Sequence, residues 1–253
     1  MNITWNAADY AKNFSFVPSY GASVIDLIDI KPGARCLDLG CGNGTLTREL
    51  AQRGLDAFGM DASPDMVELA RRDHPDLRFI LGDATSFALE SPVDVVFSNA
   101  VLHWIDRERQ GEALEHIASA LVPEGQFVFE CGGRGCGGRV HAALAQAFER
   151  RGLAYEFPFY FPTIGEYAPL VEAAGMRITD AALFDRPTTL EGTDGMADWI
   201  RMFVKRPFEG VPAPLGDEII AEAVEALRPN MLHGNTWYVD YVRLRMRAIK
   251  HVG

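Results

Sequence analysis

Five short apolar runs recur between residues 36 and 130, and amphipathic stretches separate most of them. Unbroken apolar runs of this length are typical of strands buried on both faces, whereas apolar residues repeated every three or four positions predict helices. The expected strands are 36–39, 56–60, 77–81, 93–97 and 126–130, and the expected helices are 45–53, 64–72 and 106–121. This alternation predicts an α/β fold with a doubly wound, mostly parallel sheet of the Rossmann-like kind.

Beyond residue 138 the pattern is less regular. It predicts helices at 140–151, 163–174, 196–204 and 216–227, a proline-bearing linker at 207–214, a further strand at 177–186, and a segment at 237–249 that fits a helix or a strand. We therefore expect a single domain, 1–253, in three parts. These are a core of about 30–186, an N-terminal helical lid at 1–29, and C-terminal helical additions at 187–253 that form a substrate cap.

The N-terminal segment is rich in aromatic residues. Tyr10 and Phe14 are four positions apart, so they share one face of a helix. An aromatic face of this kind covers other apolar surface. It either docks the helix on the body of the protein or forms a lid over a site, and the sequence leaves both interpretations open.

Net charge narrows the range of partners. The chain carries 35 acidic and 24 basic residues, for a formal net charge of −11. Duplex nucleic acid requires a concentrated basic surface, so we expect no nucleic-acid partner. We expect no membrane partner either, because no apolar run approaches the roughly 18 residues of a membrane helix. The first residues lack the pattern of a signal peptide, and we expect a cytoplasmic protein, a monomer or weak homodimer.

The four cysteines form two pairs with the same spacing. Cys36 and Cys41 flank one glycine-rich stretch, and Cys131 and Cys136 lie in another. Zinc-binding knuckles usually separate their cysteines by two residues, whereas four residues intervene here, and no histidine lies at ligand spacing. We predict buried thiols in a reducing compartment and no metal site.

A glycine turn follows the first expected strand. Gly40, Gly42 and Gly44 lie two residues apart, and Thr45 begins the next helix. A strand, a tight glycine turn and a helix N-terminus create a backbone surface that a ligand approaches closely. The other strands end in polar residues as well: the acids and amide at strand ends are Asp38, Asp61, Asp83 and Asn99. Because ligands bind at the carboxyl ends of such sheets, we predict a site there.

Two cofactor classes use a glycine turn of this kind. A dinucleotide site has the spacing G-x-G-x-x-G, whereas the spacing here is G-x-G-x-G with Thr45 in the next position. Asp38 would also repel a diphosphate, but it suits a cation. S-adenosylmethionine (SAM) carries an ammonium and a sulfonium and no phosphate, so we favour SAM over a nicotinamide dinucleotide.

Each acidic residue has a part in binding SAM. Asp38 attracts the amino group, the turn leaves room for the methionine moiety, and Asp61 accepts hydrogen bonds from both ribose hydroxyls. Asp83 accepts from the adenine amine beside the N–H of Ala84, and Met66 packs on the adenine ring. A lone acid at a strand end is often only a helix cap, but three at successive strands favour a ligand. The predicted cofactor contacts are Asp38, Gly40, Cys41, Gly42, Asp61, Ala62, Met66, Asp83, Ala84 and Asn99.

Four spaced motifs in residues 30–135 resemble those of the class I SAM-dependent methyltransferases. Residues 36–44, Cys-Leu-Asp-Leu-Gly-Cys-Gly-Asn-Gly, are similar to motif I, residues 59–64 with Met66 to the second motif, and residues 82–84 to the third. Residues 97–104 resemble the branch containing trans-aconitate methyltransferase and malonyl-carrier-protein O-methyltransferase, and 194–201 resemble its C-terminal part. The resemblance implies methyl transfer from SAM to a small molecule, with S-adenosylhomocysteine (SAH) as product.

The acceptor is less well defined by the sequence. A hydroxyl acceptor needs a base, whereas a carboxylate needs none but favours arginine forks. His103 is the candidate base or positioning residue, or else a buried structural histidine. Arg134 suits a carboxylate acceptor, whereas the aromatic side chains of the predicted substrate contacts suit a flat or apolar acceptor. The predicted substrate contacts are Tyr10, Phe14, Arg134 and Trp199.

We predict O-methylation of a carboxylate or hydroxyl. The alternatives are a non-catalytic SAM-binding regulatory module and, disfavoured by Asp38 and Thr45, an NAD-dependent oxidoreductase.

Overall fold

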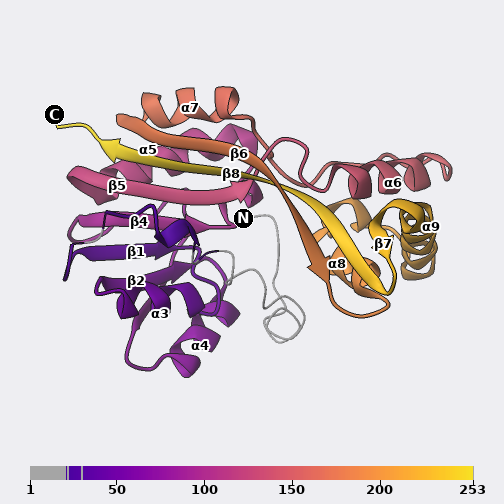
Figure 1. The fold of residues 1–253 in the computed structure, drawn as a ribbon, viewed down its shortest axis with the longest axis horizontal. Helices are drawn as coiled ribbons and strands as arrows, with labels where there is room; N and C mark the ends of the chain where they lie inside the picture. The colour runs from indigo at the N-terminus through magenta and orange to yellow at the C-terminus, as the bar shows by residue number, and fades with distance from the viewer. Residues whose placement is uncertain (1–20, 22, 30, 253) are drawn as a thin grey trace. The chain divides into compact units, whose positions relative to one another are not determined.

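The fold is built on one mixed, mostly parallel sheet. The computed structural model describes residues 21, 23–29 and 31–252 (Figure 1). Within these residues the strand order is β3-β2-β1-β4-β5-β8-β6, and the short β7 pairs with β8 alone. The strands are β1 (Arg35–Leu39), β2 (Asp56–Asp61), β3 (Arg78–Leu81), β4 (Val93–Asn99), β5 (Leu121–Gly132), β6 (Met176–Leu190), β7 (Leu232–His233) and β8 (Thr236–Lys250).

The first five strands run parallel, as the buried apolar runs predict. Strand order reverses between β1 and β4, which lie side by side. At such a switch point the chain leaves the two strands in opposite directions, so a crevice for a ligand opens at their carboxyl ends. The sheet therefore places Asp38 and Asn99 at the same edge, on neighbouring strands.

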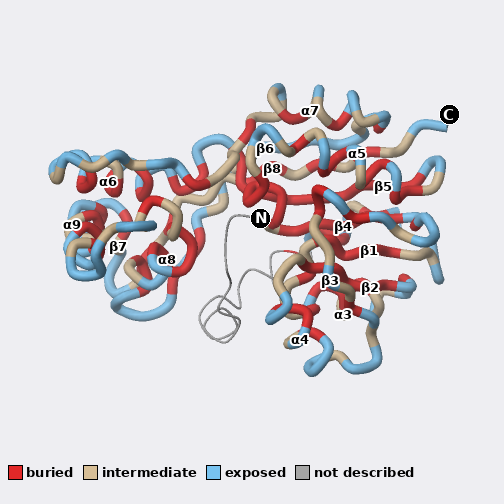
Figure 2. Tube along the Cα trace, turned by 180° about the vertical axis from the view of Figure 1, so that it is seen from behind, coloured by how far each residue is buried: buried red, intermediate tan, exposed pale blue. Residues whose placement is uncertain are grey.

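Helices cover both faces of these strands because the strands are apolar on both sides. One face packs against α5 (Gln110–Ala120) and α7 (Ile164–Ala173), and the other packs against α3 (Thr45–Gln52) and the segment 24–28. Figure 2 shows that β1, β4 and β5 are buried along most of their length. The other α-helices within residues 31–252 are α4 (Pro64–Asp73), α6 (Gly138–Glu149), α8 (Gly195–Phe203) and α9 (Ala213–Met231). No described helix is long and apolar enough to span a membrane.

Several elements differ from the sequence prediction. The undecided tail is strand β8, inserted between β5 and β6, so the C-terminal part is not wholly helical. The strand expected at 126–130 begins at Leu121, with a bulge opposite residues 93–95 of β4. Helix α9 begins at Ala213, three residues earlier than expected, because a proline is tolerated in the first turn of a helix.

The chain forms two compact units. Unit 1 contains the described residues up to 133, with 160–183 and 244–252, and unit 2 contains 134–159 and 184–243. Strands β6 and β8 each pass from one unit into the other. Residues 134–159, assigned above to the core, thus belong to unit 2, and the last residues of β8 belong to unit 1. The single domain with an N-terminal lid stays a prediction.

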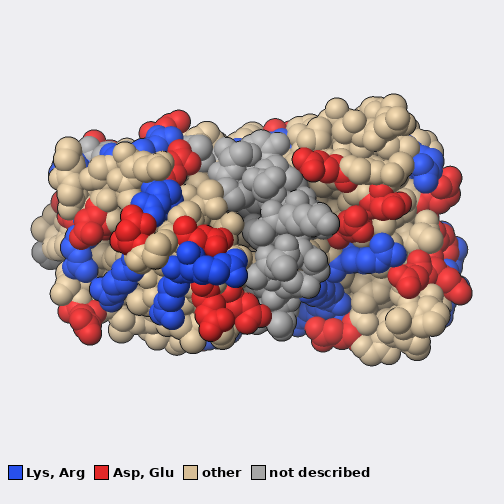
Figure 3. Space-filling model, turned by 90° about the horizontal axis from the view of Figure 1, so that it is seen from below, with Lys and Arg blue, Asp and Glu red and all other residues tan. Residues whose placement is uncertain are grey.

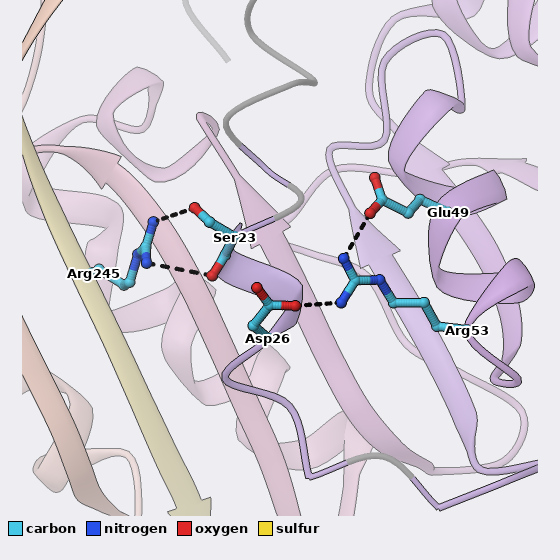
Figure 4. Close-up of polar contacts among 5 residues, drawn as sticks. All are labelled: Ser23, Asp26, Glu49, Arg53 and Arg245. Carbon is cyan, nitrogen blue, oxygen red and sulfur yellow. Dashed lines mark hydrogen bonds and ion pairs between the residues drawn. The ribbon is translucent and has the colours of Figure 1, made fainter.

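The segment that follows residue 22 is attached to unit 1 on two sides. Arg245 of β8 donates to the carbonyl oxygen and the hydroxyl of Ser23, at 3.3 and 2.9 Å (Figure 4). Arg53, which follows α3, forms an ion pair with Asp26. The predicted substrate contacts Tyr10 and Phe14 lie outside the described residues, and so does most of the predicted lid.

Candidate functional site

The glycine turn after β1 is held by the end of β2. The backbone amides of Gly40 and Cys41 both donate to the carbonyl oxygen of Met60, at 2.7 and 3.0 Å. The next amide, of Gly42, donates to Oδ2 of Asp61 at 2.9 Å. The turn is therefore fixed by three hydrogen bonds before any ligand binds, which lowers the entropy lost on binding.

The three glycines are needed for different reasons, although all have positive φ. A Cβ on Gly40 would lie 2.1 Å from Cγ2 of Val101, and one on Gly44 would lie 2.7 Å from Cζ of Phe79. These two positions are filled by the protein itself. At Gly42, in contrast, no described atom lies within 4 Å of the position a Cβ would take. Gly42 therefore provides the open backbone that a ligand could approach.

Asp38 lies in the middle of the buried sheet, 1% exposed. Its Oδ2 accepts a hydrogen bond of 2.7 Å from the hydroxyl of Thr47, on α3. Burial raises the pKa of the Asp38 carboxyl to about 7; the Thr47 hydrogen bond opposes this rise, and the charge of Asp61 adds to it. A buried carboxyl in this state gains from a cation beside it.

Asp61, 7% exposed, links the turn to the start of α4. Oδ2 accepts from Gly42 as described, and Oδ1 accepts from the amide of Ser63 at 2.8 Å. Burial raises the pKa of this carboxyl, and its backbone hydrogen bonds oppose the rise. A carboxylate has about four acceptor positions in all, so Asp61 can accept from a ribose hydroxyl in addition to its backbone donors.

The predicted adenine contacts lie at the next strand end. Oδ1 of Asp83 accepts from the amide and the hydroxyl of Thr85, at 2.8 and 2.7 Å. Burial by itself raises the pKa of the Asp83 carboxyl, but the Thr85 hydrogen bonds and the charge of Arg109 outweigh it and lower the pKa. Met66 and Ala84 are buried, whereas Ala62 is half-buried. With its pKa lowered, Asp83 is an anion near neutral pH.

Asn99 ends β4 and is 8% exposed. Among the described residues, no group hydrogen-bonds to its buried Oδ1. A buried acceptor without a partner is rare, because it loses its hydrogen bonds to water and gains nothing in return. This oxygen and the ionisable Asp38 at the same sheet edge fit the ammonium of SAM, and Asp61 and Asp83 fit its ribose and adenine. Which of these residues touch the cofactor stays a prediction.

His103 lies in a 3-10 turn (Leu102–Trp104) two residues after β4 and is 7% exposed. Its Nδ1 accepts a 3.2 Å hydrogen bond from the amide of Gly132, the last residue of β5. The ring packs against Trp104 and Phe161, with centroids 5.2 and 5.7 Å away. The imidazole is therefore oriented by a backbone donor, which also determines its tautomer.

The two substrate candidates of unit 2 differ in exposure. Arg134 is exposed, whereas Trp199 is 3% exposed and donates from Nε1 to the hydroxyl of Tyr241 at 2.7 Å. Trp199 belongs to an aromatic cluster that includes His141, whose Nδ1 lies 2.6 Å from the hydroxyl of Tyr155. Burial lowers the pKa of His141 to about 4, so it is neutral. Their role in binding substrate stays a prediction.

All four cysteines are buried thiols outside any disulfide, as predicted. Burial raises the pKa of Cys41, and Asp38 and Asp61 raise it further, so this thiol stays protonated beside the turn. No group of three or more potential ligands within the described ranges could hold a metal ion.

The sequence analysis missed three residues that shape the site. Thr47 is a polar residue on the apolar face of α3, and that position could have indicated a partner on β1. Thr85 follows Asp83 by two residues, a spacing typical of a local turn. Arg109, which donates to Thr85, comes from a distant position, and only the fold brings it there.

The strand order, the glycine turn and the acids at the strand ends define a Rossmann-like, nucleoside-binding α/β protein. Residues 36–125 match the family model described as a methyltransferase domain. An uncharacterized methyltransferase of Schizosaccharomyces pombe is 32% identical over 258 residues, covering 97% of this chain and 98% of its own. A trans-aconitate 2-methyltransferase of Methylobacterium nodulans is 31% identical over 220 residues, or 81% of each chain.

A solved structure has the same fold. The YcgJ protein of Bacillus subtilis superimposes with a TM-score of 0.65 at 19% identity, covering 93% of this chain and all of the other. The chain belongs to the class I SAM-dependent methyltransferases, in the branch that includes the trans-aconitate methyltransferases. The cofactor is therefore SAM, and the oxidoreductase and the non-catalytic module are set aside.

Proposed function

We propose that this enzyme transfers the methyl group of SAM to a carboxylate oxygen of a small-molecule acceptor, forming a methyl ester and SAH. The observation that carries the proposal is the hydrogen bond from the Gly132 amide to Nδ1 of His103. A carboxylate acceptor requires no base, whereas a hydroxyl acceptor must lose a proton.

The tautomer of His103 favours a carboxylate acceptor over a hydroxyl acceptor. An amide N–H donates to Nδ1, so Nδ1 carries no proton and the proton of the neutral ring is on Nε2. Nε2 is then a donor, and the basic nitrogen faces the backbone. His103 in this state donates a hydrogen bond to an acceptor oxygen and does not take its proton. That geometry suits an anionic oxygen that is already nucleophilic.

The remaining residues hold the reactants. When bound, SAM supplies a methyl group activated by the adjoining sulfonium. Asp61 and Asp83 bind the ribose and adenine, and Asp38 and Asn99 bind the amino group. The turn with open backbone at Gly42 leaves room for the methionine chain. Because methyl transfer is an in-line displacement, orientation and exclusion of water are the main contributions of the protein.

The relative named trans-aconitate 2-methyltransferase supports a carboxylate acceptor, since trans-aconitate is a carboxylate. Within that proposal Arg134 is a candidate fork for a second carboxylate, and Tyr10, Phe14 and Trp199 are candidate contacts for the acceptor's apolar part. The absence of a nucleic-acid partner and a cytoplasmic location stay predictions. On the face that Figure 3 shows, the acidic and basic side chains of the described residues are interspersed. This mixture of charges supports the absence of a nucleic-acid partner.

The test uses methyl-labelled SAM with panels of carboxylic acids and matched alcohols. A methyl ester releases labelled methanol in alkali, whereas a methyl ether or an N-methyl product does not. We expect alkali-labile label from carboxylic acids only. Alkali-stable label from alcohols or amines would overturn the proposal.

Two variants of His103 separate a donor from a base. His103→Gln keeps a donor near Nε2 but has no basicity, whereas His103→Leu has neither. We expect the Gln variant to retain most of kcat and the Leu variant to lose about tenfold or more. A Gln variant as inactive as the Leu variant, with a wild-type pH profile that rises through the pKa of a base, would instead indicate base catalysis.

A further inference from the structure

We propose that Ala100 is a positioning residue of the methyltransferase, whose left-handed backbone conformation holds Asn99 and His103 in place. The inference rests on the proposed function for His103 and on the predicted cofactor contact for Asn99. Ala100 follows β4 directly and has φ of +61°. A side chain with a Cβ disfavours this region, so the surrounding structure must impose it.

The backbone of Ala100 is held at both of its polar groups. Its amide donates to the carbonyl oxygen of Glu130 on β5 at 2.8 Å. Its own carbonyl oxygen accepts from Nε1 of Trp104 at 3.1 Å. One bond extends the pairing of β4 with β5 by a residue, and the other closes the turn that contains His103. Together they overcome the preference of alanine for other conformations.

The turn at Ala100 acts on three parts of the site. Before it, Asn99 keeps a buried Oδ1 with no hydrogen bond from the described residues. After it, the side chain of Val101 fills the place that a Cβ on Gly40 would take, so it packs directly on the glycine turn. His103 follows in the 3-10 turn Leu102–Trp104, and its Nδ1 accepts from the amide of Gly132. A change of φ at Ala100 would therefore displace a cofactor contact and the proposed acceptor contact together.

The chain offers a matched control. Among the described residues, Glu124 is the other non-glycine with positive φ, at +62°. It is exposed and lies in the bulge at the start of β5, whereas the site lies at the carboxyl ends of the strands. Glu124 thus shares the backbone conformation of Ala100 without its position.

The experiment compares Ala100→Val and Ala100→Gly with Glu124→Val, measuring SAH affinity by calorimetry and Tm for each. A β-branched residue is strongly disfavoured at positive φ, and glycine is not. We expect Ala100→Val to weaken SAH binding about tenfold or more and to reduce kcat further. The Ala100→Gly variant should keep wild-type SAH affinity and kcat, with Tm unchanged or higher. Glu124→Val should lower Tm yet bind SAH within about twofold of wild type.

Wild-type SAH affinity in Ala100→Val would overturn the proposal, and so would a Glu124→Val variant that loses affinity in step with its Tm. If Ala100→Val does not fold, Ala100→Leu, which is unbranched at Cβ, provides the same comparison. SAH binding requires no acceptor. Loss of affinity in Ala100→Val therefore supports the positioning role even if the ester product is not found, and the two failures are distinguishable.

Discussion

The amide of Gly42 donates to Oδ2 of Asp61 across 2.9 Å, so the residue predicted to bind the ribose also holds the glycine turn. Its other oxygen accepts from Ser63 at the start of α4. A single carboxylate thereby joins β1, β2 and α4 at the site. The glycine turn and the predicted ribose contact are therefore one structural unit.

Replacing Asp61 should therefore weaken SAH binding by more than the loss of one hydrogen bond would. In Asp61→Ala the Gly42 amide loses its partner, and the ribose hydroxyls lose the acceptor that we predict for them. We expect SAH affinity to fall about 100-fold or more, since hydrogen bonds to a charged group contribute about 1.5–3 kcal/mol each. Calorimetric titration with SAH measures this. Asp56→Ala, at the exposed start of the same strand, should bind normally; equal loss in both variants would contradict the assignment.

Cofactor binding should depend on pH through Asp38. Its pKa of about 7 in the free protein is raised mainly by burial, and a bound ammonium stabilises the ionised form and lowers that pKa. Binding SAH below pH 7 therefore releases a proton, and affinity rises with pH up to about 7 and then levels off. Calorimetry in buffers of different ionisation enthalpy measures the released proton. Asp38→Asn should abolish the release.

The Thr47→Val variant tests whether Asp38 is the group that titrates. The Thr47 hydroxyl donates to Asp38 and lowers its pKa, so removing it should move the pH midpoint of SAH binding upward. The sign for folding is opposite to that for binding. Because the folded-state pKa is raised, the unliganded protein loses stability as pH rises from about 4 to 7. A midpoint that stays fixed in Thr47→Val would show that another group titrates.

The ion pair between Glu130 and Arg245 should matter for stability. The Glu130 side chain is fully buried, and Arg245 donates to its Oε2 at 2.6 and 2.8 Å. Arg245→Met leaves a buried charge without this partner, which we expect to reduce the free energy of unfolding by about 3 kcal/mol or more. The double variant Glu130→Gln/Arg245→Met should recover most of it. Urea unfolding measures both.

The exposed ion pair between Asp26 and Arg53, drawn in Figure 4, is the matched control. The Asp26 side chain is 65% exposed and pairs with Arg53. Asp26→Ala should change the free energy of unfolding by less than about 1 kcal/mol, because water screens the pair. Similar losses of unfolding free energy in Arg245→Met and Asp26→Ala would show that burial does not determine how much each ion pair contributes to stability.

Patterns local in the chain were predicted well. The first four strands, the glycine turn and helices α3 and α4 follow from apolar runs, glycine spacing and the Ser63-Pro64 cap, each set by a few neighbouring residues. The strand at 237–249 could not be separated from a helix. Its identity depends on pairing with β5 and β6, which lie far away in the sequence.

The sequence by itself determined the cofactor class, because Asp38, Asp61 and Asp83 recur at strand ends that a parallel sheet must bring to one edge. Only the tertiary structure decided the hydrogen-bond partners and the protonation states of the groups at the site. The partner of Asp38, the tautomer of His103 and the burial of the Asn99 oxygen, which no described group hydrogen-bonds, each depend on contacts between separate elements. Burial and hydrogen bonding between distant residues set protonation, and no local pattern in the chain records them.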